Sequence, residues 1–337
     1  MTAYCLLEPA FVAVPPLKNV PDQIFSWLHE LVEFGSVARN RFNPRLLLPE
    51  QLADSLSRAE RMATFSAIRV MLETNGLQDV FAVPDILRTI QWLLDRLRTI
   101  ESSFNTFAVG EIQTIDPKLT SCDDANLNAA LEDMLVAAAG VLIDRRNISF
   151  LVATPQSEIR STKVAGERIV SRFSSSTKEV VEVIEPFKIE LPLVRSWHQF
   201  LSEVDDEAVW AEAMDSTDLE FALLIRAARL NSTIGRFQFG AGFVDSLKRN
   251  SAWGDGPFAK AVLRVCADVL LKEDALEVGP FYSDRARQIQ ATKVGGHLGW
   301  RTHITKGGVG LRLMYWKNGI GDVEFSRIGP KHEGKIE

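Results

Sequence analysis

The net charge of the chain changes sign near residue 285, and this change constrains how the chain can be divided into folding units. The last 53 residues, Arg285 to Glu337, contain ten Lys and Arg against four Asp and Glu, while the whole chain contains 38 against 44. An acidic body near −12 therefore precedes a basic tail near +6. Three of the five histidines and several aromatic residues lie in the tail. Cations mixed with aromatic rings favour a polyanion with stacking bases, and histidines suit proton transfer near neutral pH.

The residue pattern of the tail predicts a small antiparallel sheet. Trp300 to Thr305 and Gly310 to Trp316 alternate between the two faces that a half-buried strand presents. Asn318-Gly319 marks a tight connection to a third strand, Val323 to Ile328. Apolar residues at helical spacing predict that a helix, Pro257 to Lys272, precedes the sheet.

The alternation also predicts which side chains share a face. Arg301, His303 and Thr305 fall on one face of the first strand, which is unusual for a hydrophobic core. On the second strand, Arg312 falls on one face with two large apolar residues, and Tyr315 on the other with Leu311 and Leu313.

Three segments of the tail carry a resemblance to a known family. They are Gly299 to Lys306, Gly310 to Trp316 and Val323 to Gly329, followed by a charged end, Pro330 to Glu333. Together with the preceding helix they resemble the RelE/ParE superfamily of small bacterial toxins over about residues 257–337. The resemblance implies an α+β module, a helix followed by a small twisted antiparallel sheet. The chain departs from the family in one respect, because those toxins are mostly short, free-standing and strongly basic.

The resemblance also implies a function. RelE-like toxins cleave messenger RNA on the ribosome without a metal, and ParE-like toxins act on DNA gyrase. We expect a nucleic-acid-directed, toxin-like protein with metal-free endoribonuclease activity, in a toxin–antitoxin or antiviral (phage) defence setting. Its partners would be RNA or DNA and a protein, either an antitoxin or a defence-complex subunit. The alternative is a non-catalytic component of a larger bacterial defence complex that binds nucleic acid or protein.

Cleavage through a ribose 2′-hydroxyl needs a base, an acid and cations for the phosphorane. By resemblance, Arg301 and Arg312 stabilise phosphate charge. Four residues are candidates for proton transfer and orientation: His303, Tyr315, Lys331 and His332. Five further residues are candidates for nucleic-acid binding: Lys293, Trp300, Lys306, Lys317 and Arg327. No metal or other cofactor is expected. Each assignment has a structural alternative, since strand cations are often solvated edge residues and Tyr or Trp is often core.

The remaining sequence predicts an α/β N-terminal region. We expect an α/β domain of unknown role at 1–170, a mixed strand and helical region at 178–250 and the RelE-like basic module at 251–337. Strands are expected at Tyr4 to Val14, Phe107 to Ile115, Ser149 to Thr154 and Glu179 to Leu191. Helices are expected at Asp22 to Arg39, Glu50 to Glu60, Ala63 to Asn75, Asp85 to Glu101, Asp124 to Arg145 and Val194 to Asn231. Ser171 to Lys178 reads as a loop or linker.

A metal-dependent nuclease in the N-terminal region is a second alternative. Leu131 to Ala139 with Ser149 to Thr154 is similar to the late helix and strand of PIN-type nucleases. The expected aspartate of the first strand is missing, and Glu8 would take its place. Asp123 and Asp124 are explained equally by capping of a helix, and Glu132 and Asp133 by exposure to solvent.

Sequence features that report on location point to the cytoplasm. The N-terminus lacks the basic segment and uninterrupted apolar run of a signal peptide. The most apolar segment, Met134 to Ile143, is too short to cross a bilayer, so no membrane association is expected. Cys5, Cys122 and Cys266 are far apart, which favours neither disulfides nor a zinc knuckle.

Overall fold

The computed structural model describes residues 2–16, 21–39, 41–42, 45–104, 112–119, 124–145, 148–155, 159–173, 180–271, 276–284, 286–293, 295–305 and 310–331. It is a mixed α/β structure with two compact units. We refer to Ala3–Phe200 as the N-terminal unit, and to the unit formed by Leu201–Glu337 as the C-terminal unit. The division falls inside the region expected at 178–250. Residues up to Phe200 belong with the first sheet, and residues from Leu201 belong with the second.

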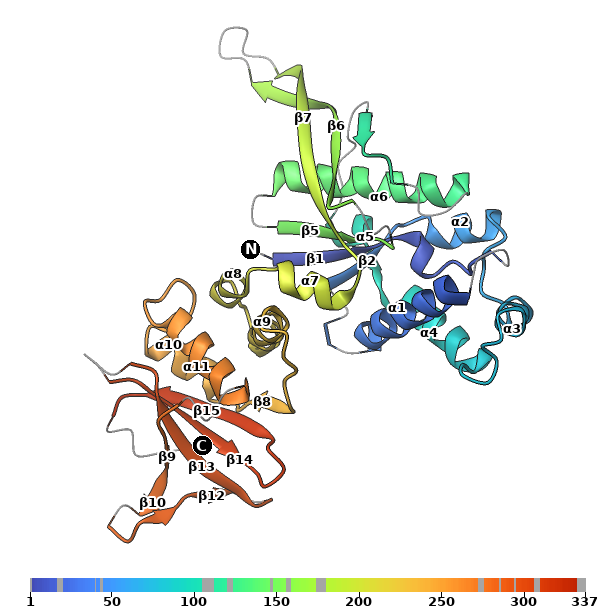
Figure 1. The fold of residues 1–337 in the computed structure, drawn as a ribbon. Coiled ribbons are helices and arrows are strands. Elements are labelled where there is room, and N and C mark those ends of the chain that lie inside the picture. Colours follow the sequence, from blue (N-terminus) through green and yellow to red (C-terminus); the bar gives the residue numbers. More distant parts are fainter. Residues whose placement is uncertain are drawn as a thin grey trace. The chain divides into compact units, whose positions relative to one another are not determined.

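The N-terminal unit is built on one seven-stranded sheet (Figure 1). In spatial order its strands are β3 (Arg98–Thr99), β2 (Leu46–Leu48), β1 (Thr2–Leu7), β5 (Ile148–Ala153), β7 (Val180–Val194), β6 (Ser161–Phe173) and β4 (Ile112–Asp116). The pairs β1–β2, β2–β3 and β5–β7 are parallel, and β7–β6 and β6–β4 are antiparallel. The parallel strands are rich in buried Leu and Val, as strands covered on both faces must be.

Helices cover both faces of the parallel part of this sheet (Figure 1). The helix α6 (Ala125–Asp144) lies on one side of β1 and β5, and α1 (Pro21–Arg39) and α4 (Val83–Arg96) lie on the other. Four shorter helices complete the unit: the 3-10 helix η1 (Pro9–Phe11), α2 (Leu52–Arg58), α3 (Phe65–Thr74) and α5 (Ile100–Phe104). The helix α7 (Trp197–Glu203) follows β7 and spans the unit boundary.

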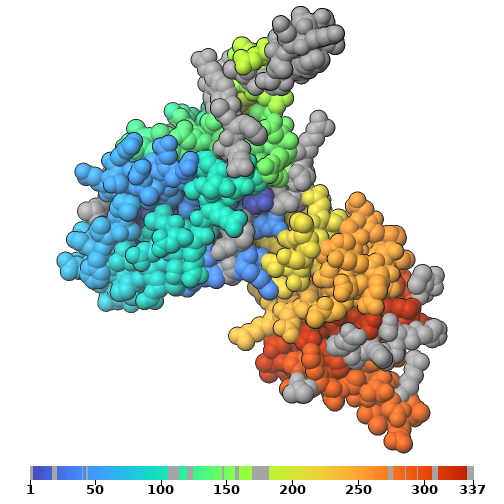
Figure 2. All heavy atoms as spheres, turned by 180° about the vertical axis from the view of Figure 1, so that it is seen from behind, coloured from blue at the N-terminus to red at the C-terminus, as the bar shows by residue number. Residues whose placement is uncertain are grey.

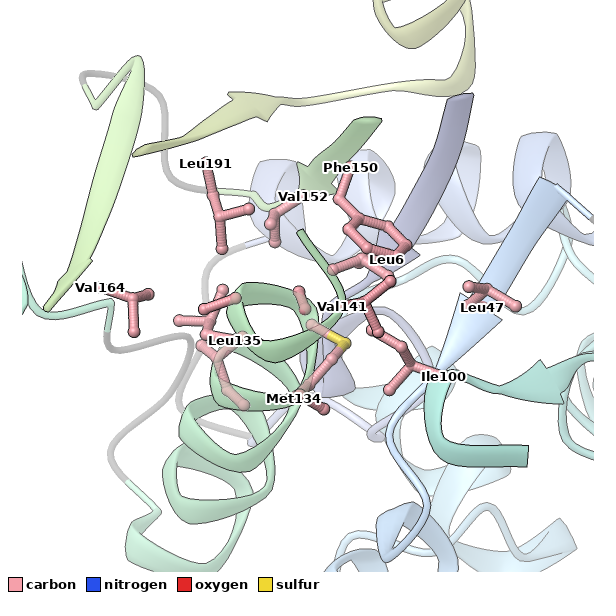
Figure 3. Packing of buried hydrophobic residues seen from close by; sticks show 14 of the residues in the cluster. Leu6, Leu47, Ile100, Met134, Leu135, Val141, Phe150, Val152, Val164 and Leu191 are labelled. Atoms are coloured by element: carbon pink, nitrogen blue, oxygen red, sulfur yellow. The ribbon is translucent and has the colours of Figure 1, made fainter. Parts of the chain in front are cut away.

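The buried face of α6 makes the main core of this unit (Figure 3). Met134 and Val141 lie on the side of α6 that faces Leu6 and Phe150, and Leu135 lies on the side of Val164 and Leu191. Burying side chains of this size removes about 1.5–3 kcal/mol of unfavourable hydration each. The alternation of small and large residues on α6 lets the helix approach the sheet closely, because Ala137, Ala138 and Ala139 are also buried.

The length and composition of α6 also meet the criterion for a membrane-spanning helix. An 18-residue window of this 20-residue helix has a mean hydropathy of 1.4, so the expectation that no segment approaches this length is wrong. A core helix has the same properties, and 50% of the apolar stretch is buried inside the protein. We draw no conclusion about a membrane from this one helix.

The helices α1 and α4 approach each other closely at Gly35. A Cβ atom at this position would lie 2.3 Å from Cγ2 of Thr89. The Thr89 hydroxyl donates a hydrogen bond to the Asp85 carbonyl oxygen at 2.8 Å, which fixes the side chain against the helix. Glycine at position 35 is therefore required by packing and not by backbone conformation.

The antiparallel strands β6 and β7 extend beyond the rest of their sheet. They pair from Ser161 with Pro192 to Phe173 with Val180. Their far ends project past the helices of the same unit (Figure 2). Ser171 to Phe173, which were expected to begin a loop, belong to β6, and residues 174–178 of that loop lie outside the described range.

The C-terminal unit begins with helices. They are α8 (Asp206–Ala211), α9 (Ser216–Arg229), α10 (Phe243–Arg249) and α11 (Ala259–Leu271). The side chain of Asp206, 2% exposed, accepts hydrogen bonds from Arg226 at 2.8 Å and Arg229 at 2.5 Å, which joins the start of α8 to the end of α9. The helix expected over Val194 to Asn231 is in fact three helices, α7, α8 and α9, and the N-caps Asp205 and Asp215 start the second and the third.

The sheet of the C-terminal unit has its strands in the order β12 (Thr292–Lys293), β13 (His297–His303), β14 (Arg312–Lys317), β15 (Val323–Gly329) and β8 (Phe237–Phe239). The strand β9 (Val278–Pro280) also pairs with β13, and β10 (Tyr282–Asp284) pairs with β11 (Ile289–Gln290) in a separate ribbon. The predicted antiparallel pairing of three strands is confirmed for β13, β14 and β15. The parallel edge strand β8 was not predicted.

Candidate nucleic-acid interface

Cross-strand pairing gathers basic side chains on one face of the C-terminal sheet. In the pairing of β13 with β14, Arg301 lies opposite Met314 and His303 lies opposite Arg312. In the pairing of β14 with β15, Met314 also lies opposite Arg327. Directly opposed residues of antiparallel strands project to the same side of a sheet. We call the side that carries Arg301, His303, Arg312 and Arg327 the cationic face.

The opposite face of the same strands is covered by helices and is apolar. Tyr315 and Phe325 are fully buried there, with ring centroids 6.5 Å apart. Phe239 of β8 stacks on Phe243 of α10 with ring centroids 4.7 Å apart, and both rings contact Phe325. Tyr315 is thus a core residue at 0% exposure, and its assignment to the catalytic set is corrected on this ground.

Two other candidates lie on the apolar side of the sheet. Trp300 is opposite Tyr315, and Lys317 is opposite Leu298, two positions along the strand from Trp300. Both are half-buried. Alternation separates them from Arg301 and Arg312, so neither contributes to the cationic face.

Arg312 and His303 have buried polar atoms without a hydrogen-bond partner among the described residues: Nε and Nη1 of Arg312 and Nδ1 of His303. The same holds for Nδ1 of His297 and for Nε of Arg327. Arg301 and Arg327 each take part in a further interaction within the protein, and Arg312 is the arginine with two such nitrogens. A buried polar atom without a partner costs about 1–3 kcal/mol, more when charged. An anion that accepted hydrogen bonds from Arg312 would remove this cost.

A glycine lies opposite Arg312 on β15. It is Gly329, which is itself buried and presents no side chain to the cationic face. Sequence reasoning did not single out Gly329, although a glycine inside a strand often marks a close approach by a ligand or by backbone. Gly310, with φ of +60°, lies just before β14, and a Cβ atom there would be 3.9 Å from Cβ of Lys331. Exposed Lys331 therefore lies near the end of β14 that carries Arg312.

His332 and Lys306, the remaining catalytic and binding candidates at this end of the sheet, lie outside the described residues.

Arg327 is placed on the cationic face by an irregularity in the pairing of β14 with β15. Met314 pairs with Arg327 and Tyr315 with Phe325, so Ser326 is an extra residue in β15. This bulge turns Arg327 towards Met314 while keeping Phe325 in the core. Arg327 is only 8% exposed.

The other end of the cationic face is closed by a small apolar cluster. Trp316 packs with Phe281, Ala291 and Met314. A Cβ atom at Gly299, opposite Trp316, would lie 3.3 Å from the Trp316 ring and 3.2 Å from Cβ of Ala291. This cluster restricts the candidate site to the end of the face with His303 and Arg312.

Lys293, a candidate for nucleic-acid binding, is engaged by a carboxylate at this closed end. Its Nζ atom lies 2.6 Å from Oε1 of Glu324, and Gln238 donates a hydrogen bond to Oε2 of the same carboxylate at 2.9 Å. Glu324 neutralises much of the charge that Lys293 would offer to a phosphate.

The N-terminal carboxylates do not form a comparable site. Glu8 is fully buried, and burial raises its pKa to about 8 against the smaller, lowering effect of a hydrogen bond with the Thr154 side chain. Asp124 caps α6 by accepting hydrogen bonds from the amides of Asn126 and Leu127, as the capping interpretation predicted, and Glu132 pairs with Lys118 at 2.7 Å. Asp123 lies outside the described residues.

A metal centre of the PIN type needs several carboxylates that converge on one point. In the described part of the chain, no group of three or more His, Cys, Asp and Glu side chains is placed to hold a metal ion. Asp133 of α6, another residue of that hypothesis, has a pKa raised by burial and by the nearby charge of Glu132.

Comparison with protein-family models, with curated proteins and with solved structures gave no match to this chain. The assignment of a function therefore depends on the geometry of the cationic face.

Proposed function

We propose that the C-terminal unit acts on RNA through the cationic face, binding the phosphate backbone beside Arg312 and His303 and cleaving it without a metal. The observation that carries the proposal is the half-buried Arg312 guanidinium, two of whose nitrogens lack a partner among the described residues, opposite a histidine. Arginine presents a planar fork of donors that matches phosphate oxygens, and its charge persists at every physiological pH.

In this proposal His303 transfers the proton. As a base it would take the proton of a ribose 2′-hydroxyl, whose oxygen then attacks the adjacent phosphorus. Arg312 would stabilise the charge that develops on the phosphorane, and the 5′-oxygen would leave with a proton from a second donor, for which Lys331 is a candidate. The products would be a 2′,3′-cyclic phosphate and a free 5′-hydroxyl.

The resemblance of the tail to RelE/ParE toxins supports the same proposal and extends it. On this resemblance we expect a toxin–antitoxin or phage-defence setting, with translating messenger RNA as substrate and a protein partner that restrains the activity. A non-catalytic role, in which the same face only binds nucleic acid, is the competing function, and the experiment below separates the two.

The test uses the purified full chain with two labelled strands of the same sequence, one RNA and one with 2′-O-methyl groups throughout. Cleavage of the RNA alone, unchanged by EDTA and yielding cyclic phosphate ends, is the expected result. An in vitro translation reaction is run in parallel, because related toxins act on ribosome-bound messages. Binding without cleavage in both reactions would replace the enzyme with the binding function.

A salt titration of binding checks the phosphate contacts. Each phosphate neutralised by a cation should contribute a slope of about −0.7 to the logarithm of affinity against the logarithm of salt concentration for a single strand. Arg312→Ala should reduce this slope by about 0.7. Arg249→Ala is the matched control, because Arg249 is an exposed cation on α10, which packs against β15 on the apolar side. Salt-independent binding would contradict the proposal.

A further inference from the structure

A groove of about 480 Å³ in the N-terminal unit gathers titratable side chains that the proposed function does not use. Most of its lining comes from one face of α1: Asp22, Phe25, Ser26, His29, Glu30 and Glu33. The intervals of three and four residues between them are those of a single helical stripe. Ser196 and His198, at the start of α7, line the other side.

The backbone of α7 is attached to this stripe. The amide of His198 donates a hydrogen bond to Oε1 of Glu33 at 2.9 Å. This contact joins residues 165 positions apart in the sequence, and it holds His198 at the edge of the groove. This hydrogen bond joins the two walls of the groove at one point.

Three carboxylates, those of Asp22, Glu30 and Glu33, share the groove. The cation whose charge acts on Glu30 is Arg195, and its effect on the Glu30 pKa is smaller than that of the Glu33 charge. Glu30 accepts only a long hydrogen bond from Ser26, at 3.4 Å. Burial and then the charge of Glu33 raise the pKa of Glu30 to about 7, against the lowering effects of Ser26 and Arg195. A bound cation would relieve this repulsion.

The spacing of the carboxylates along α1 indicates how long a cation that contacts all of them must be. At a rise of 1.5 Å per residue, Asp22 and Glu33 are separated by about 17 Å along the helix. A single metal ion cannot contact both ends of such a stripe, in keeping with the finding that no described group converges to hold one. A chain of several positive charges joined by apolar links can do so.

We propose that this groove binds a linear aliphatic polyamine, with ammonium groups at Asp22 and at the Glu30–Glu33 pair and methylene groups along Phe25. Phe25 is 49% exposed, and its ring offers both an apolar surface and an attraction for cations. The imidazoles of His29 and His198 and the hydroxyls of Ser26 and Ser196 supply further hydrogen-bond acceptors for ammonium groups. The proposal concerns the N-terminal unit and is independent of RNA cleavage by the C-terminal unit.

The experiment is isothermal titration of the full chain with spermidine in about 0.15 M salt, where weak surface attraction is largely screened. Butylamine, with a single ammonium group, should bind at least about tenfold more weakly. The double variant Glu30→Gln/Glu33→Gln should also lose at least about tenfold in affinity. Asp54→Asn/Asp79→Asn removes the same charge from exposed positions of the same unit and should change affinity by less than about twofold.

Asp22→Asn provides a second variant, which keeps the size of the side chain at an exposed position in the first turn of α1. It should weaken spermidine binding measurably. Equal affinity of the groove variants and the control variant would overturn the proposal, as would failure of the unaltered chain to bind spermidine. Tighter binding of a tri-lysine peptide than of spermidine would also overturn it, and would assign the groove to the side chains of a protein partner.

Discussion

His303 and Arg312 occupy directly opposed positions on β13 and β14, so a single phosphate group can contact both side chains. Two residues that act on one group should be energetically coupled. We predict that His303→Ala and Arg312→Ala each reduce RNA cleavage at least about tenfold, and that the double variant loses less than the product of the two. Arg312→Lys should restore only part of the loss, because the bidentate fork is absent. Strictly multiplicative effects in single-turnover assays would argue against a shared phosphate.

The boundary of the C-terminal unit leads to a prediction about fragments. A fragment of residues 251–337 lacks β8, which pairs with β15, and α10, which packs against it. Aromatic rings from both elements contact Phe325. We expect residues 251–337 to be insoluble or unfolded, and residues 201–337 to unfold cooperatively by circular dichroism. If the isolated 201–337 fragment cleaves RNA faster than the full chain does, the acidic N-terminal unit restrains it. A folded 251–337 fragment would show that the edge strand and α10 are dispensable.

Buried Glu8 predicts an unusual dependence of stability on pH. Its pKa is about 8 in the folded protein, above the ordinary value of 4.5, so the folded state holds a proton that the unfolded state releases. Its contribution to stability is present in full below pH 4.5 and is lost as the pH rises to about 8. The loss is about 1.4 kcal/mol per pH unit within this window.

The comparison for this prediction is Glu8→Gln, which keeps the shape of the side chain and cannot titrate. Urea denaturation of both proteins at several pH values should show a fall in stability between pH 5 and 8 that is smaller in the variant by about 1.4 kcal/mol per pH unit. Parallel stability curves for the two proteins would mean that Glu8 is ionised in the folded state.

The contact between Gly35 and Thr89 predicts a pair of compensating substitutions. Gly35→Ala should destabilise the protein by about 1–3 kcal/mol, although alanine favours a helix, because the new methyl group overlaps Cγ2 of Thr89. Thr89→Ser removes Cγ2 and keeps the hydroxyl bonded to Asp85, so the double variant should recover most of the loss. Thermal unfolding of the two single variants and the double variant measures this coupling. Additive changes would show that α1 and α4 move apart instead.

The sequence predicted the helices and strands that are long enough to show a periodic pattern of apolar residues. The alternation in Arg312 to Trp316 placed Arg312 and Tyr315 on opposite faces, as the structure does. Assigning Tyr315 to catalysis by resemblance overrode that pattern, and the buried position of the ring shows the pattern to be the better guide.

The parts that escaped prediction are those set by distant residues. The strands β2 and β3 have three and two residues, too few to show a period, and the helical pattern that continued to Glu101 concealed the end of α4 at Arg96. The opposition of His303 and Arg312 depends on register, which is fixed by pairing and by the connections between strands. The groove on α1 depends on His198, far along the chain, and α1 alone shows only a polar face.

The parallel pairing of β8 with β15 means that β8 is synthesised well before the strand with which it pairs. Val323 pairs with Phe237, so β8 leaves the ribosome more than eighty residues before its partner strand exists. Until β15 is synthesised, Phe237 and Phe239 have no strand to pair with, and their backbone N–H and C=O groups remain without sheet hydrogen bonds. A nascent chain that stops short of Val323 would carry an adhesive segment recognised by chaperones and proteases. The strand that completes the finished sheet is therefore an exposed edge for as long as the sheet is incomplete.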